Sequence, residues 1–249
     1  MSKENAVRRG NDLLLRDKLV DVLEYMQDKD GDYSFKALCT VIEAIFERPS
    51  QDLTEITENL PSTLFSHDIQ SILADFISQS WEGQSAALAT GICFSLLRKE
   101  FLSTDIEVKV HPANQAGSSS KEVLDIDVYH QNQIETAIEV KDKPFSPKDV
   151  EHAVSKAIKS GLQGTIFVIG PQAHLTEQTL DQVTAYWKQK NIALTFIKLE
   201  ELIGFTGYMT PAIESGTLVK IIQSKLEGMK AKDELKKHIY LIFKKRGWI

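Results

Sequence analysis

The sequence predicts an α/β fold in which a mixed β-sheet is flanked by helices, and three observations lead to this prediction. Strand-like segments are confined to residues 105–198, while helical spacing of apolar residues dominates on either side of them. Residues 125–129 and 136–141 are separated by a short polar turn, which is typical of an antiparallel hairpin. Beyond that hairpin, helices and strands alternate, as they do between parallel strands.

The remaining elements follow from local pattern. Strands are expected at 105–110, 125–129, 136–141, 164–170 and 193–198, and helices at 66–79, 82–101, 146–159 and 175–190, in the rest of 12–80 and at the C-terminus. The segment 164–170 is continuously apolar, which is typical of a strand buried on both faces. We therefore expect an N-terminal helical region (1–80), a core (81–205) and a C-terminal basic helical region (206–249).

Composition is that of a globular protein, with 42% hydrophobic and 26% charged residues in 249 residues and a net charge of −6. No apolar run is long enough to span a membrane, and the first residues do not resemble a signal peptide, so we expect no membrane association and a cytoplasmic location. Cys39 and Cys93 lie within apolar helical patterns and are expected to be reduced core residues, with a disulfide as the alternative.

The C-terminal segment 220–246 is basic, with nine Lys or Arg residues against three acidic ones. Two interpretations have about equal weight. One is a solvated helix face, and the other is a surface that contacts phosphates.

The predicted hairpin carries a group of charged residues. Asp125 and Asp127 share one face of the first strand because side chains alternate along a strand, and Glu139 and Lys141 share a face of the second strand for the same reason. If the hairpin closes, carboxylates and an ammonium meet at one place on a sheet. That arrangement can hold Mg²⁺ and a water molecule for phosphodiester hydrolysis.

Context distinguishes this Glu-x-Lys triplet from the two others in the chain, at 107–109 and 234–236. Only the triplet at 139–141 has an aspartate on an adjacent strand, apolar neighbours and a following helix. Several buried carboxylates would also repel one another without a cation. The alternative is a structural ion pair between Lys141 and Glu139, with the aspartates at an exposed strand end.

With this order of elements, the chain resembles the PD-(D/E)XK nuclease superfamily. Segments 137–150 and 161–169, with 83–88 and the loop at 114–117, are similar to SacI-type restriction endonucleases, and the resemblance spans roughly residues 80–200. The proline of the superfamily motif is absent, because Leu124 precedes Asp125 and Ile126 precedes Asp127. The choice between the two aspartates therefore stays open, although the family pattern favours Asp125.

The resemblance implies a restriction-endonuclease-like core and a type II enzyme that uses Mg²⁺ to cut double-stranded DNA. Asp125 and Glu139 would hold the metal with the backbone carbonyl of Val140, and Asp127 would be a helper or a substitute. Lys141 would orient or deprotonate the attacking water, or stabilise the transition state. Glu82, near the start of a helix, would be an accessory acid, although an ordinary exposed residue is an equally good interpretation.

DNA contacts are expected from polar residues on either side of the hairpin, with a solvated loop as the alternative. These residues are Lys109, His111, Asn114, Gln115, Ser118, Ser119, Ser120 and Lys121 before it, and Lys143 and Lys148 after it. A palindromic target, GAGCTC in SacI-type enzymes, would require a homodimer, and a DNA methyltransferase would protect the host. A repair or structure-selective nuclease and a non-catalytic DNA-binding module are the alternative functions.

Overall fold

The computed structural model describes residues 20–46 except 23, 27 and 28, together with residues 59–112, 122–173 and 177–248. The chain divides into two compact units, Met1–Ser50 and Gln51–Ile249. Each unit is described by itself. The three-part division at residues 80 and 205 remains a prediction.

The N-terminal unit is helical where it is described. Residues 20–22 and 24–26 are helical, and a second helix, α2, spans Gly31–Phe46. Asp30 lies just before α2, and its Oδ1 accepts the backbone N–H of Tyr33 at 2.8 Å, which satisfies one of the free donors at the helix start. The Tyr25 and Tyr33 rings meet edge to face at 6.5 Å and join the two helical segments.

A five-stranded mixed sheet forms the centre of the second unit and confirms the predicted fold class. Its strands are β2 (Ile106–Val110), β3 (Ile126–His130), β4 (Gln133–Lys141), β5 (Gly164–Ile169) and β6 (Ala193–Lys198), in the spatial order β2-β3-β4-β5-β6. The pairs β2–β3 and β3–β4 are antiparallel, and β4–β5 and β5–β6 are parallel. The antiparallel hairpin followed by parallel strands is the predicted arrangement.

The β3–β4 hairpin turns at Gln131 and Asn132, which have φ values of +50° and +62°. Two consecutive left-handed residues match the twist of paired strands, and Asn tolerates that conformation better than most residues. Ile126 lies opposite Ile138, and a register shift follows between Val128 and Tyr129. The turn and register together determine which side chains meet at the other end of the hairpin.

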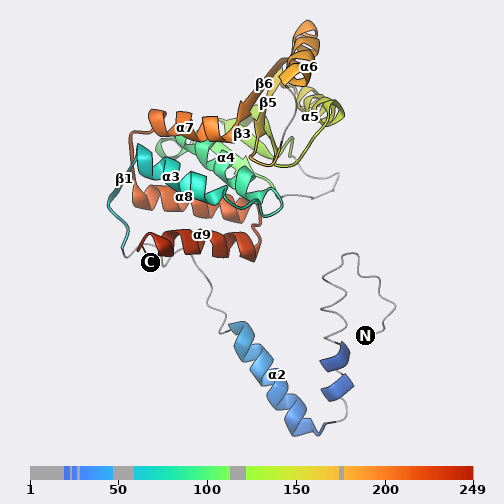
Figure 1. Cartoon of the computed structure of the whole chain (residues 1–249), viewed down its shortest axis with the longest axis vertical. Helices are drawn as coiled ribbons and strands as arrows, with labels where there is room; N and C mark the ends of the chain where they lie inside the picture. Colours follow the sequence, from blue (N-terminus) through green and yellow to red (C-terminus); the bar gives the residue numbers. More distant parts are fainter. Residues whose placement is uncertain are drawn as a thin grey trace. The chain divides into compact units, whose positions relative to one another are not determined.

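Helices cover both faces of the sheet, as Figure 1 shows for the strands between α5 and α6 on one side and α4 and α7 on the other. The first face packs on α5 (Pro147–Lys159) and α6 (Glu177–Gln189). The second packs on α4 (Gln84–Leu97), α7 (Leu199–Met209) and α8 (Ser215–Gly228), and α3 (Ser66–Phe76) and α9 (Asp233–Lys245) join the same hydrophobic cluster. The two faces have separate hydrophobic clusters, and β4 contributes Ala137 to the first and Ile138 to the second.

The C-terminal helices are part of the larger cluster. Leu218, Ile222, Leu235 and Phe243 from α8 and α9 are buried in it. The basic residues of this segment are partly used in ion pairs within the fold, including Lys225 with Glu100 and Arg246 with Asp75. A packing role therefore accounts for part of the positive charge.

A small second sheet was not predicted. It pairs β1 (Thr63–Phe65) with β7 (Ala212–Glu214) in antiparallel register and brings the start of α3 beside the start of α8. Each strand is only three residues long, so neither contains enough alternation to be recognised in the sequence. A 3-10 turn, η2 (Glu100–Leu102), follows α4.

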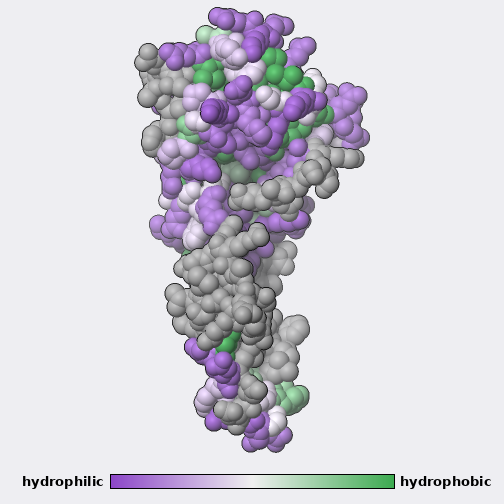
Figure 2. All heavy atoms as spheres, turned by 90° about the vertical axis from the view of Figure 1, so that its right-hand side faces the viewer, coloured by the Kyte–Doolittle hydropathy of each residue, from purple (hydrophilic) through white to green (hydrophobic). Residues whose placement is uncertain are grey.

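The surface agrees with the compositional expectation, and of the two cysteines expected in the core, Cys93 is buried while Cys39 is only partly buried. Hydrophilic side chains dominate the upper part of the face in Figure 2, where the described residues are coloured. Both cysteines are free. Within the described ranges, none of the helices has the length and apolar character needed to cross a membrane.

Candidate active site

Asp125, Glu139 and Lys141 lie together where β3 begins and β4 ends. Asp125 is one residue before β3, and extending the pairing of Ile126 with Ile138 places it opposite Glu139. The Oδ2 atom of Asp125 accepts the backbone N–H of Val140 at 2.8 Å. The strand alternation predicted from the sequence thus brings the aspartate and the Glu-x-Lys triplet to one face of the sheet.

Glu139 and Lys141 form an ion pair in which the ammonium donates to Oε1. Both side chains are largely buried, at 12% and 17% exposure. Burial lowers the pKa of Lys141, but the negative charges of Glu139 and Asp125 outweigh it and hold that pKa above its usual value. Lys141 is therefore protonated at neutral pH.

Asp125 has an unusual protonation equilibrium. Burial first, and then repulsion from Glu139, raise its pKa from 3.8 to about 7. The Val140 N–H and the charges of Lys141 and Lys156 act in the opposite direction without cancelling the shift. Two carboxylates, Asp125 and Glu139, therefore lie near one ammonium in a largely buried site, where a bound divalent cation would stabilise their ionised forms.

The donor set fits a magnesium ion better than a metal that needs a complete protein cage. No cluster of three or more His, Cys, Asp or Glu residues suited to a metal occurs in the described part of the chain. Mg²⁺ is commonly held by one or two carboxylates, with waters and substrate phosphates completing its shell. Asp125 and Glu139 supply two such carboxylates on adjacent strands.

Asp127 is placed differently from Asp125, although both belong to the same face of β3. It is fully buried, and its carboxylate accepts the backbone N–H groups of Val123 at 3.0 Å and Leu124 at 3.3 Å. Its Oδ2 lies 2.8 Å from Nε2 of His111. The contacts of Asp127 are therefore with the segment entering β3 and the residue after β2.

His111 was not singled out from the sequence as a structural partner of Asp127. It follows Val110 at the end of β2, and its backbone N–H donates to the Asp125 carbonyl at 2.9 Å. Its place two residues after Lys109 puts it on the acidic face, which is the one signal in the sequence that could have identified it.

The loop before α4 contacts the end of β4. The Ser80 hydroxyl donates to the Asp142 carboxylate, which also accepts the Gln172 N–H at 3.1 Å. Trp81, Glu82 and Gly83 in this loop all have positive φ values, of 45°, 59° and 86°. Such a backbone is held only when its surroundings over-determine it.

Glu82, the predicted accessory acid, lies in this loop. Its carboxylate is exposed and pairs with Lys232 Nζ at 2.7 Å. The backbone N–H of Lys232 also donates to the buried Gln84 side chain at 3.1 Å. The turn between α8 and α9 is thereby attached to the start of α4.

The structure describes only some of the residues predicted to contact DNA. Lys109 lies on β2, 3.0 Å from Glu107 and 4.7 Å from the centre of the Tyr129 ring. Lys143 and Lys148 are exposed just beyond β4. Asn114, Gln115, Ser118, Ser119, Ser120 and Lys121 lie outside the described residues.

Comparison with known families identifies a related domain. Residues 61–171 match the model of the SacI restriction endonuclease C-terminal domain. This confirms the resemblance predicted from the sequence and supports a restriction endonuclease, and thus a nuclease that binds DNA. The matched segment runs from before β1 to just after β5 and includes Asp125, Glu139 and Lys141. A comparison with curated proteins found no match.

Proposed function

We propose that this protein is a type II restriction endonuclease that uses Mg²⁺ to hydrolyse phosphodiester bonds in double-stranded DNA at a specific site. The observation that carries the proposal is the grouping of Asp125, Glu139 and Lys141 at one end of the β3–β4 hairpin. This group lies within the segment that matches the SacI domain.

Asp125 and Glu139 would hold the magnesium ion together with the Val140 carbonyl. When bound, Mg²⁺ polarises the scissile phosphate and lowers the pKa of its water. The raised pKa of Asp125 supports this assignment, because burial and then the Glu139 charge disfavour its ionised form, and a bound cation would stabilise that form. The hydrogen bond from Val140 holds the Asp125 carboxylate beside Glu139.

Lys141 would act as a donor in the hydrolysis. Its raised pKa keeps the ammonium protonated at neutral pH, so it can donate to the attacking water and to the phosphate oxygens but has no lone pair to take a proton. A donor aimed at charge that develops in the transition state contributes strongly to catalysis in a buried site. We therefore assign Lys141 to orientation and charge stabilisation.

DNA binding and symmetry complete the proposal. Lys143 and Lys148 are exposed and follow the catalytic strand, which suits them to phosphate contacts. Lys109 belongs to the same sheet face, and the loop residues Asn114, Gln115, Ser119 and Lys121 are proposed from sequence. A palindromic site, GAGCTC-like by analogy, calls for a homodimer with two-fold symmetry. A DNA methyltransferase would complete the restriction system.

The test is cleavage of plasmids of different sequence in the presence of Mg²⁺. The wild type should give discrete fragments, while Lys141→Ala and Glu139→Ala should cut about 10²–10³-fold more slowly. Lys188→Ala, which changes an exposed lysine of α6, is the matched control and should cut like the wild type. DNA binding by all variants should be measured with Ca²⁺ in place of Mg²⁺.

Each alternative has its own outcome. Nicking or branch-dependent cutting without fixed sequence would indicate a repair or structure-selective nuclease. Tight, salt-dependent binding without cleavage would indicate a DNA-binding module. If both site variants cut at the wild-type rate, the Lys141–Glu139 pair would be structural only.

A further inference from the structure

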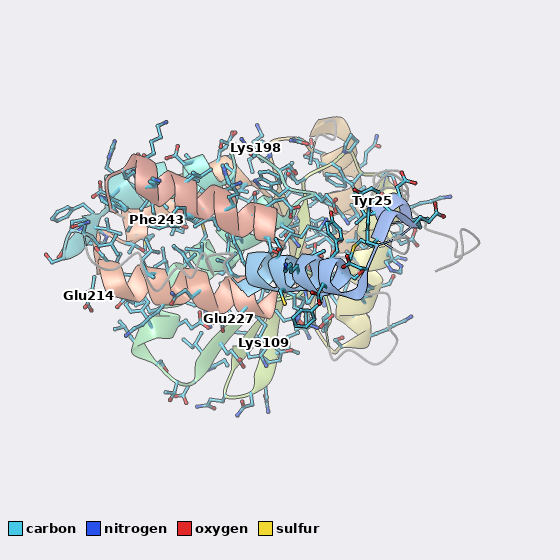
Figure 3. The ribbon with its side chains drawn as sticks, turned by 90° about the horizontal axis from the view of Figure 1, so that it is seen from below. Tyr25, Lys109, Lys198, Glu214, Glu227 and Phe243 are labelled. Atoms are coloured by element: carbon cyan, nitrogen blue, oxygen red, sulfur yellow. The ribbon has the colours of Figure 1, made fainter. Side chains whose placement is uncertain are left out.

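A groove of about 420 Å³ lies along β2 and β3. Its described lining residues are Glu107, Lys109, His111, Glu122, Tyr129 and Asn132. Glu107 and Lys109 alternate with the buried Val108 and Val110 along β2, and Lys109 is opposite Asp127. The groove thus opens on the sheet face that carries Asp125. One of its lining residues, Lys109, is labelled in Figure 3.

Buried contacts hold one wall of the groove in place. His111 has the Asp127 carboxylate 2.8 Å from its Nε2, and the Glu122 carboxylate 3.6 Å from its Nδ1. Asp127 also accepts the N–H groups of Val123 and Leu124, so one fully buried carboxylate connects the residue after β2 to the segment before β3. A wall supported in this way can present polar groups in fixed positions.

The charges of the groove do not suit the DNA backbone. Glu107 and Glu122 both contribute carboxylates, while Lys109 is paired with Glu107 at 3.0 Å and stacked on Tyr129. A phosphate placed here would meet two negative side chains against one lysine that is already paired. Phosphate-binding surfaces instead carry an excess of Lys and Arg.

The same side chains suit the edges of bases. A carboxylate accepts hydrogen bonds from the exocyclic amino group of cytosine, asparagine pairs with adenine, and lysine donates to the acceptors of guanine. Tyr129 adds a ring and a hydroxyl to the groove. The groove therefore has donors and acceptors that discriminate between bases, on the same sheet face as the carboxylates of the proposed metal site.

We propose that this groove is a base-reading subsite for DNA, in which Glu107 and Glu122 accept hydrogen bonds from exocyclic amino groups. His111 is a positioning residue that Asp127 holds against Glu122. This inference rests on the proposed function, because it takes DNA as the substrate. It extends that function by naming groove residues that discriminate between bases.

Replacing the carboxylates should weaken DNA binding if they contact bases and strengthen it if they face phosphates. The preferred site is first obtained by selecting bound duplexes from a random library in Ca²⁺, which requires no cleavage. Affinity for that duplex and for duplexes with single base-pair changes is then measured for Glu122→Ala and Glu107→Ala. The control is Glu135→Ala, which removes a carboxylate of β4 that pairs with Arg98 outside the groove.

If the groove reads bases, each variant should bind the selected duplex about 5–150-fold more weakly and lose discrimination at one base pair. The slope of affinity against salt should stay the same, because no phosphate contact is lost. Glu135→Ala should keep the wild-type preference.

Stronger binding of every duplex by the two variants would show that the carboxylates face phosphates and would overturn the inference. Unchanged affinity and selectivity would overturn it as well. If the wild type selects and cuts a defined site but the variants keep its specificity, only the groove assignment fails. If the wild type neither selects a sequence nor cuts DNA, the proposed function and the groove assignment both fail.

Discussion

The carboxylate of Asp125 and the backbone N–H of Val140 form a 2.8 Å hydrogen bond between the start of β3 and the end of β4. This contact places Asp125 beside the Glu139–Lys141 ion pair, whereas Asp127 is held by Val123, Leu124 and His111. The two aspartates, equivalent in the sequence pattern, thus have different surroundings, and different consequences are expected from changing them.

Asp125→Asn should slow single-turnover cleavage about 10²–10³-fold with little change in KM, because it removes a proposed metal ligand. Asp127→Asn should instead raise KM and leave kcat near the wild-type value, because it loosens the wall that holds His111. Hydrogen exchange of the Val123 and Leu124 amides should accelerate in Asp127→Asn and not in Asp125→Asn. Equal loss of kcat in both variants would identify Asp127 as a metal ligand.

Magnesium binding should depend on pH through Asp125. Its carboxyl has a pKa of about 7 in the metal-free protein, so below that pH a proton must leave before the group can bind a metal. Affinity for Mg²⁺ should therefore fall about tenfold for each pH unit below 7, which isothermal titration calorimetry can measure. Asp125→Asn should remove this dependence, and a flat profile in the wild type would contradict the assignment.

The same shift has a consequence for stability. Because the pKa is raised from 3.8 to about 7, the folded metal-free protein binds more protons than the unfolded chain between these values. The contribution of Asp125 to stability is therefore full at low pH and is lost as pH rises through 7. In urea unfolding, the free energy of unfolding of the wild type should fall as pH rises from 3.8 to about 7. Asp125→Asn should lack this contribution.

Glu82 and Lys232 offer a test of the accessory acid. If Glu82 assists the metal site, Glu82→Gln should slow cleavage about tenfold or more, while Lys232→Met should change the rate little. Loss of their exposed ion pair alone should cost at most about 1 kcal/mol in either variant. If both substitutions change the cleavage rate equally, Glu82 acts only through its ion pair with Lys232 and does not assist the metal site.

Lys225 and Glu100 stabilise the outer edge of the sheet. Lys225 Nζ lies 2.7 Å from Glu100 Oε2 and donates to the Val108 carbonyl at 2.6 Å, while the Val108 N–H donates to Glu100 Oε1 at 2.9 Å. The pair therefore satisfies both backbone groups of Val108, a residue of the outermost strand β2. Such protection prevents unwanted pairing of an edge strand.

Lys225→Met should destabilise the fold by about 3–5 kcal/mol, because it leaves the Glu100 carboxylate without its buried partner. In a unit of this size, that loss corresponds to a Tm lower by about 6–20 °C. Lys220→Met, at an exposed position of the same helix, is the control and should melt near the wild type. Equal Tm values for the two variants in differential scanning calorimetry would contradict this account.

Local pattern was sufficient to predict most of the central fold. Alternation at 125–129 and 136–141 specified the hairpin, and continuous apolar character at 164–169 specified a strand buried on both faces. These signals are local because side-chain burial repeats every second residue along a strand. The strands β1 and β7 were not predicted because three residues are too few to show a period. Their pairing also joins segments far apart in the chain.

The sequence by itself determined that acidic side chains and Lys141 would share one face of a hairpin, because alternation depends only on residue spacing. Only the tertiary structure decided that Asp125, and not Asp127, lies beside Glu139. That outcome depends on the register of β3 against β4 and on the burial of Asp127 against His111. Both are long-range contacts that no local pattern encodes, and they divide two similar carboxylates between a proposed metal site and a groove wall.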